Sequence, residues 1–183
     1  MLWSMEEFPA PEAYGRVSDP DRYVVLQQAA DVLLNRLAEE YVVQRTEGVD
    51  VDQDLARRAG VRRVVRLSPR PREGAPLTVA FTTFPGVLVR YGRWYVEEYP
   101  RCGCDACDEQ AQALTREMTD RVDTLVAGGF SEELKRWLRP ALRFRFASRT
   151  DQSSAAGEVR LRRAQARALG RSTRCGWPAW QKR

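Results

Sequence analysis

Four consecutive strand-like segments lie between residues 61 and 99. They read VRRVVRL, LTVAFTTF, VLVRYG and RWYVEEY, and each is rich in β-branched and aromatic residues. Pro85-Gly86 separates the second segment from the third, and Gly92 ends the third. Connections this short join antiparallel neighbours. The pattern therefore predicts an antiparallel meander. Its expected core positions are Val79, Phe81, Val87, Val89, Trp94 and Val96.

Amphipathic helices are predicted on both sides of the meander. Apolar residues recur every three or four positions from Pro20 to Tyr41, which predicts one long helix. A second stripe predicts a helix from Asp108 to Ala127 that stops at Gly128-Gly129. A short helix is also expected between Asp52 and Ala59.

The C-terminal region is expected to be less regular. The predicted elements are a short helix at 131–139, a fifth strand at 141–147 (ALRFRFA), a loop at 150–157 and a basic helix at 159–169. Trp177 and Trp180 would be unusual in a free tail, so we expect both to pack against the body of the protein.

These elements predict a single α+β domain over residues 1–183. It consists of a four- to five-stranded antiparallel sheet packed by the N-terminal helix and by the helix after the cysteine motif described below. The length of 183 residues is that of one ordinary domain. We expect residues 1–18 to form an extended entry, and 139–183 to form a basic C-terminal segment packed on the body.

The chain carries no signal for a membrane or for export. No apolar run approaches the roughly 18 residues that a membrane span requires. The first 15 residues are acidic and lack the basic start and apolar centre of a signal peptide. We therefore expect a cytoplasmic protein with no membrane partner.

Charge and composition restrict the classes of function that the chain can have. The chain has no histidine, which excludes Ser-His-Asp and Cys-His catalysis. Residues 139–183 hold 12 basic side chains and two acidic ones, for a net charge of +10. The first 138 residues carry a net charge of −5. Attraction between an acidic body and a basic segment explains this asymmetry. Nucleic-acid binding through Arg139–Arg183 is the alternative.

Three cysteines fall within six positions of the motif CGCDACDE at 102–109. This motif, together with YGRVSDPDRY at 14–23 and FPGVLVRYGRWYVEEYP at 84–100, resembles a family of actinobacterial proteins catalogued as a domain of unknown function. The resemblance implies one coherent domain in a cytosolic bacterial protein. It implies no activity, substrate or catalytic residue.

The cysteines allow three interpretations. A structural zinc would use Cys102, Cys104 and Cys107, with Cys175 as the fourth ligand, or with Asp105 or Asp108 supplying an oxygen in its place. A thiol redox enzyme would use Cys104 and Cys107, which form a C-x-x-C at a helix start. In the third interpretation the cysteines pack as small apolar residues, and Asp105 or Asp108 caps the following helix.

Carboxylates are dense near the motif but do not indicate a catalytic pair. Glu97 and Glu98 are adjacent on a predicted strand and therefore face opposite sides of the sheet. We interpret them as solvated charge. The leading prediction is a non-catalytic binding or accessory module with a structural cysteine corner, for which zinc is the candidate cofactor; the thiol redox enzyme and the nucleic-acid binder are the alternatives.

Overall fold

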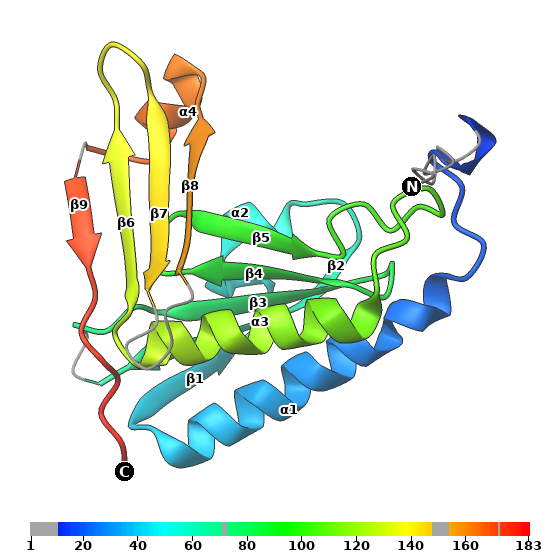
Figure 1. Ribbon diagram of the computed structural model, residues 1–183. Helices are drawn as coiled ribbons and strands as arrows, with labels where there is room; N and C mark the ends of the chain where they lie inside the picture. Colours follow the sequence, from blue (N-terminus) through cyan, green and yellow to red (C-terminus); the bar gives the residue numbers. More distant parts are fainter. Residues whose placement is uncertain (1–10, 71–72, 148–153, 172) are drawn as a thin grey trace, which may run out of the picture.

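Two antiparallel β-sheets and two long helices make up the computed structural model, in which the strands of the second sheet run across one end of the first (Figure 1). The structure describes residues 11–70, 73–147, 154–171 and 173–183. The first sheet has the order β1-β2-β3-β4-β5, with strands at Val43–Glu47, Val61–Pro69, Leu77–Thr82, Val87–Tyr91 and Tyr95–Tyr99. The second has the order β8-β7-β6-β9, with β6 at Phe130–Lys135, β7 at Ala141–Ala147, β8 at Ser154–Arg160 and β9 at Thr173–Gly176.

The helices differ greatly in length. The α-helices are α1 at Val24–Glu40, α2 at Gln53–Ala56, α3 at Ala111–Val126 and α4 at Arg163–Ala168. Turns of 3-10 helix lie at Pro11–Ala13, Pro20–Tyr23 and Val49–Val51. None of the helices that the structure describes has the length and apolar character to cross a membrane.

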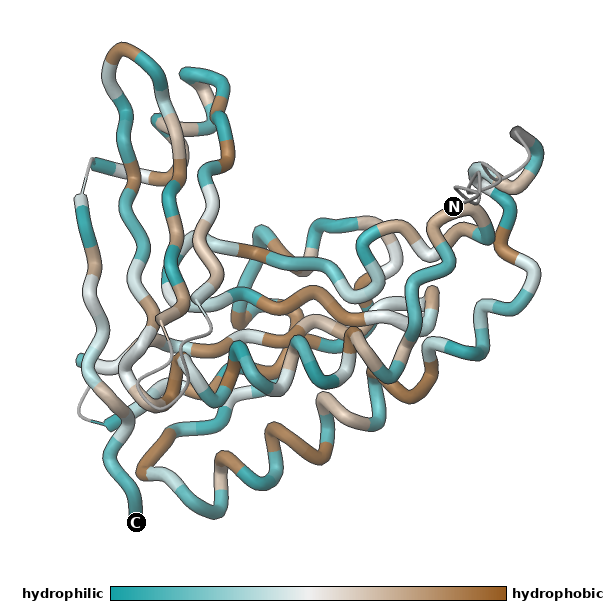
Figure 2. The backbone as a smooth tube through the Cα atoms, in the orientation of Figure 1, coloured by the Kyte–Doolittle hydropathy of each residue, from teal (hydrophilic) through white to brown (hydrophobic). Residues whose placement is uncertain are grey.

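The main core lies between the first sheet and the two long helices. Leu26, Leu33 and Leu37 of α1 are buried there, as are Leu114 and Met118 of α3. Figure 2 shows the matching pattern, with largely hydrophobic central strands and an α1 that alternates between hydrophobic and hydrophilic stretches. Each helix thus buries one apolar stripe against the sheet.

The α+β fold and the antiparallel meander are confirmed. Strands β2 to β5 pair in sequence order, and all the expected core positions except Val96 are buried. Val96 is half-buried because it lies on the opposite face of β5. The sequence did not predict β1, whose residues VQRTE lack the apolar alternation of a core strand and pair at the sheet edge with β2.

The predicted helix at 131–139 is wrong. Phe130, Glu132 and Leu134 alternate with more exposed residues and point to one face, and the segment is strand β6, paired with β7 and β9. ALRFRFA is a strand as predicted, but it belongs to the second sheet as β7. Strand pairing satisfies the backbone here, so the local helix signal is overridden.

Three other boundaries differ from the prediction. Residues 154–157 belong to β8, although a loop was expected at 150–157, and 150–153 lie outside the described residues. The basic helix is confined to α4. The helix after the cysteines begins at Ala111, three residues later than expected. Of the extended entry at 1–18, residues 1–10 lie outside the described part, and Pro11–Ala13 form a 3-10 turn.

The C-terminal tryptophans pack inward as expected. Trp180 is 5% exposed, and its Nε1 donates a hydrogen bond to the carbonyl of Ala75 over 2.9 Å. Its ring meets that of Tyr41 edge-on, with 5.7 Å between the centroids. Trp177 is partly buried against the same core.

A buried carboxylate joins the two sheets. Glu132 on β6 is 2% exposed. Its carboxylate accepts hydrogen bonds from the backbone N–H groups of Arg93, Trp94 and Tyr95, over 2.6, 3.0 and 3.2 Å. A Cβ atom at Gly92 would lie 2.5 Å from Glu132 Oε1, so this turn requires glycine. Burial raises the pKa of Glu132, and the three N–H donors oppose that rise.

Removing this carboxylate should destabilise the fold. Glu132→Ala leaves three buried N–H groups without an acceptor, so we expect the free energy of unfolding to fall by about 3 kcal/mol in urea denaturation. The matched control is Glu133→Ala on the same strand, where the side chain faces outward and the loss should stay below about 1 kcal/mol. Equal losses in the two variants would contradict the bridging role.

Candidate metal centre

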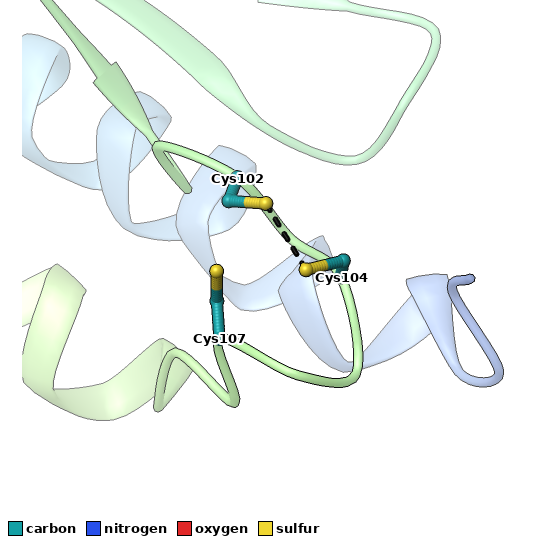
Figure 3. A group of neighbouring side chains, drawn as sticks. All are labelled: Cys102, Cys104 and Cys107. Atoms are coloured by element: carbon teal, nitrogen blue, oxygen red, sulfur yellow. Dashed lines mark hydrogen bonds between the residues drawn. The ribbon is translucent and has the colours of Figure 1, made fainter. Parts of the chain in front are cut away.

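The cysteine motif forms a tight loop between β5 and α3 (Figure 3). The backbone N–H groups of Cys107 and Asp108 both donate to the carbonyl of Cys104, over 3.2 and 3.3 Å, which closes the second half of the loop. Gly103 has a φ of 79°, and a Cβ atom there would lie 2.9 Å from the ring of Phe84. The residue between the first two cysteines must therefore be glycine.

Asp105 ties the loop to the N-terminal segment. Its carboxylate accepts hydrogen bonds from the backbone N–H of Ser18 (2.9 Å), the Ser18 hydroxyl (2.7 Å) and Arg16 Nε (2.9 Å). The same donors, in that order, lower the pKa of Asp105 to about 2. The backbone N–H of Asp105 also donates to the carbonyl of Arg16 over 2.8 Å. Asp105 thus anchors residues 16–18 to the loop. Both of its carboxylate oxygens accept hydrogen bonds from that segment, so they are not oriented as metal ligands.

Glu109 holds the first half of the loop. Its carboxylate accepts hydrogen bonds from the backbone N–H groups of Cys102 (2.8 Å), Gly103 (3.2 Å) and Arg101 (3.3 Å). The expectation that Asp105 or Asp108 caps the next helix is wrong, because Gln110 occupies the N-cap of α3. Glu109 instead accepts hydrogen bonds from residues that precede it in the chain, and it thereby orients the peptide groups around Cys102.

The three cysteine side chains converge inside the loop that these hydrogen bonds hold. Figure 3 shows the sulfurs of Cys102, Cys104 and Cys107 gathered at the centre of the loop. All three sulfurs lie within 4.8 Å of one another, and those of Cys102 and Cys104 are 3.2 Å apart. Cys104 is buried, whereas the other two are exposed. The group could hold a metal ion, and two of its three cysteines are exposed.

The loop favours a thiolate at one position. Hydrogen bonds from the Cys102 thiol, and from the backbone N–H groups of Gly15 and Cys107, lower the pKa of Cys104 to about 6. The neighbouring sulfurs of Cys102 and Cys104 raise the pKa of Cys107 to about 12. Without a cation the loop therefore favours a thiolate at Cys104 and disfavours a second one at Cys107.

The structure does not bring Cys175 to the other cysteines. It lies on β9 opposite Glu132, at the far end of the molecule from the β5–α3 loop (Figure 1). Burial raises its pKa. The pairing of β9 with β6 places it there, so no fourth sulfur reaches the loop. Asp108, the other candidate for an oxygen ligand, is exposed and lies 3.5 Å from Arg22.

Comparison with known proteins identifies the family. A family of unknown function, DUF6226, matches residues 2–183. The chain belongs to this family. Neither the search of curated proteins nor the search of solved structures gave a significant match. The resemblance noted in the sequence is confirmed at the level of a family of unknown function that spans the chain.

In this DUF6226 chain a buried charge network underlies the cysteine loop. Glu97 on β5 accepts hydrogen bonds from Tyr99 (2.8 Å) and Arg101 (2.8 Å) and forms a short ion pair with Arg121 of α3. Arg101 also binds Glu117 of α3 over 2.6 Å, which raises the pKa of Arg101. The residue immediately before Cys102 is therefore anchored to both the sheet and the helix.

Sequence reasoning missed this network. Interpreting Glu97 as solvated charge is wrong, since its carboxylate is buried. The available signal was the alternation in YVEEY, which puts Glu97 on the same face as the buried Tyr95 and Tyr99. Its cationic partner Arg121 lies 24 residues further along the chain and had no detectable link to it in the sequence.

The role of Glu109 can be tested through the backbone. Glu109→Ala removes the acceptor of three N–H groups, so the amides of Cys102 and Gly103 should exchange with deuterium at least about tenfold faster, measured by NMR. Glu98→Ala, which removes an exposed carboxylate paired with Arg58, is the matched control and should leave both rates unchanged. Unchanged protection in Glu109→Ala would show that the loop does not depend on this carboxylate.

Proposed function

We propose that the cysteine loop binds one zinc ion through Cys102, Cys104 and Cys107. The observation that supports this is the convergence of three sulfurs within 4.8 Å. Sulfurs around a tetrahedral zinc lie about 3.8 Å apart when each Zn–S bond is about 2.3 Å, so modest rotations of these side chains would satisfy the geometry. Soft thiolate ligands favour zinc, Cu(I) or iron–sulfur clusters, and clusters usually take four cysteines.

Three protein ligands leave one position of a tetrahedral zinc to water or to a group from another molecule. The exposed thiols Cys102 and Cys107 give such a group access. Asp105 and Glu109 are committed to backbone hydrogen bonds and offer no free general base beside the sulfurs. This arrangement supports a non-catalytic binding or accessory module with a structural metal.

Zinc would stabilise the point at which the first sheet, α3 and the N-terminal segment meet. The loop is connected to the sheet and to α3 through Arg101, which binds Glu97 and Glu117, and to the N-terminal segment through Asp105. Zinc supplies the positive charge that lets several thiolates share one small volume. The hydrogen bonds of Asp105 and Glu109 already orient the peptide groups of the loop. Zinc would therefore bind to a loop whose backbone is largely held in position.

Metal analysis tests this proposal. Protein purified without added metal should contain about one zinc per chain by mass spectrometry of the elements, since structural zinc binds tightly. Cys104→Ser should lose most of it, because that residue is the central ligand of the three. Cys175→Ser is the matched control and should keep its zinc.

Two results would contradict the zinc site. One is wild-type protein with well below one zinc per chain after purification in the presence of zinc. The other is full zinc content in Cys104→Ser. Loss of zinc in Cys175→Ser would instead contradict a site made by Cys102, Cys104 and Cys107 alone.

The redox alternative with Cys104 and Cys107 stays a prediction. The lowered pKa of Cys104 supports it, whereas the burial of Cys104 opposes it, because the attacking thiolate must be accessible. We also propose that the protein is cytoplasmic and bacterial. All four cysteines are free thiols, as expected in a reducing compartment. An actinobacterial origin stays a prediction from the motif.

A second candidate function, binding of double-stranded DNA, is favoured by the outward face of the second sheet. Strand register places five basic side chains on this basic face, namely Lys135, Arg143, Arg145, Arg160 and Arg174. Two acidic side chains, Glu133 and Glu158, share it. A depression of about 610 Å³ on this face is lined by three of the arginines.

The basic face is not neutralised by the acidic part of the chain. Arg143 pairs with Glu158 of the neighbouring strand, and within the described residues Arg145 and Arg174 form no ion pair. The adjoining β6–β7 turn exposes Trp137 (77%) and Leu138 (97%). Apolar residues of this kind can wedge into the minor groove, and the arginines would contact phosphates. Among the described residues, strand register places no aromatic side chain on this face for stacking on single strands, which favours a duplex.

Salt dependence tests the DNA proposal. Binding to a fluorescent duplex, followed by anisotropy, should weaken steeply with salt. Arg145→Gln should reduce the slope of log K against log[salt] by about 1, which corresponds to one lost phosphate contact. Arg57→Gln removes an exposed charge beside α2 and should leave the slope unchanged. Binding that is absent or independent of salt would eliminate this function.

A further inference from the structure

A second concave site lies on the outer face of the first sheet, away from the cysteine loop. It encloses about 430 Å³ between strands β1 to β4 and the segment that follows β9. Its polar lining comprises Gln44, Arg66, Ser68, Arg90, Arg93 and Trp177. No acidic residue among those that the structure describes lines this arginine pocket.

The arginine pocket retains positive charge after its ion pairs are counted. Arg90 lies 3.3 Å from Asp52 and 3.6 Å from Asp54, so its charge is balanced. Arg66 is half-buried and has no acidic partner among the described residues. Arg93 lies over the ring of Trp94, and its own backbone N–H is bound to the buried Glu132. Two guanidinium groups therefore remain available to an anion.

Buried polar atoms lacking a hydrogen-bond partner among the described residues occur in two lining residues, Arg90 (Nε) and Trp177 (Nε1), and in Thr78 on the adjoining strand β3. The indole Nε1–H of Trp177 is buried without an acceptor, although the same residue lines the pocket. The hydroxyl of Thr78 is also buried and unpaired, and strand register places Thr78 between Arg66 and Arg90 on the same face. Unsatisfied buried polar groups are costly, and a bound ligand or its water is a common reason for their presence.

We propose that the arginine pocket binds the phosphate group of a small phosphorylated molecule. Guanidinium groups present planar forks of N–H donors that match phosphate oxygens, and several forks suit a tetrahedral oxyanion better than a carboxylate. The pocket volume lies in the range of sites for small organic ligands. The indole of Trp177 and the neighbouring Pro69 and Pro76 would then contact the organic part. This site is independent of the proposed zinc.

Calorimetric titration tests the assignment. The probes are inorganic phosphate, pyrophosphate and adenosine monophosphate, added to the full-length protein at low salt. At least one should bind, and Arg66→Gln should weaken that binding by about tenfold or more, as expected for a lost charge-assisted hydrogen bond. Arg62→Gln is the matched control, because it removes the same charge from the same strand at an exposed position outside the pocket.

A second variant separates recognition from folding. Trp177→Phe keeps an aromatic ring but removes the indole N–H, and it should weaken binding by about threefold to tenfold with an unchanged melting temperature. The proposal is overturned if none of the three probes binds at millimolar concentration. It is equally overturned if Arg62→Gln weakens binding as much as Arg66→Gln, or if succinate binds more tightly than pyrophosphate.

Discussion

The arrangement of the two sheets depends on the hydrogen bonds that the carboxylate of Glu132 accepts. It is buried on β6 and satisfies three consecutive N–H groups in the turn between β4 and β5. The three oriented backbone N–H groups offset part of the hydration that this carboxylate loses on burial. The aromatic rings of Tyr95 and Phe144, stacked with 3.7 Å between centroids, add apolar contact beside it. Together with the other aromatic contacts between the sheets, they hold the second sheet, with its basic face and Cys175, against the first.

Carboxylates near the cysteine loop likewise hold neighbouring segments together through the hydrogen bonds that they accept. Asp105 and Glu109 accept backbone N–H groups, and Glu97 pairs with arginines that precede the motif and lie on α3. Acidic side chains therefore shape the loop around the sulfurs and do not compete with them as ligands. The consequence is a set of thiols whose backbone positions are fixed by the fold, a condition for metal binding without large rearrangement.

The three proposed sites lie on separate parts of the molecule and use different chemistry. The cysteine loop offers thiolates at the strand-to-helix junction, the basic face offers phosphate contacts on the second sheet, and the arginine pocket offers donors on the first. Electrostatic attraction between the acidic body and the basic C-terminal segment stays a prediction, and the attraction of Glu133 for Arg143 supports it. Arg143 forms its ion pair within the segment, with Glu158. Strand pairing of β9 with β6 and the burial of Trp180 also attach the segment to the rest of the protein.

Local patterns in the sequence were sufficient for α1, for strands β2 to β5 and for the stripe of α3, because periodicity and short glycine turns act between near neighbours. They also located the three cysteines at one bend. The tertiary structure alone decided that residues 130–135 form a strand, that Cys175 lies away from the loop, and that Glu97 and Glu132 are buried. Each of these outcomes depends on a partner distant in sequence: β7 and β9 for β6, Arg121 for Glu97, and the β4–β5 turn for Glu132. Hydrogen-bond and charge compensation between such distant segments leaves no periodic trace in the sequence, so it becomes visible only when the chain is folded.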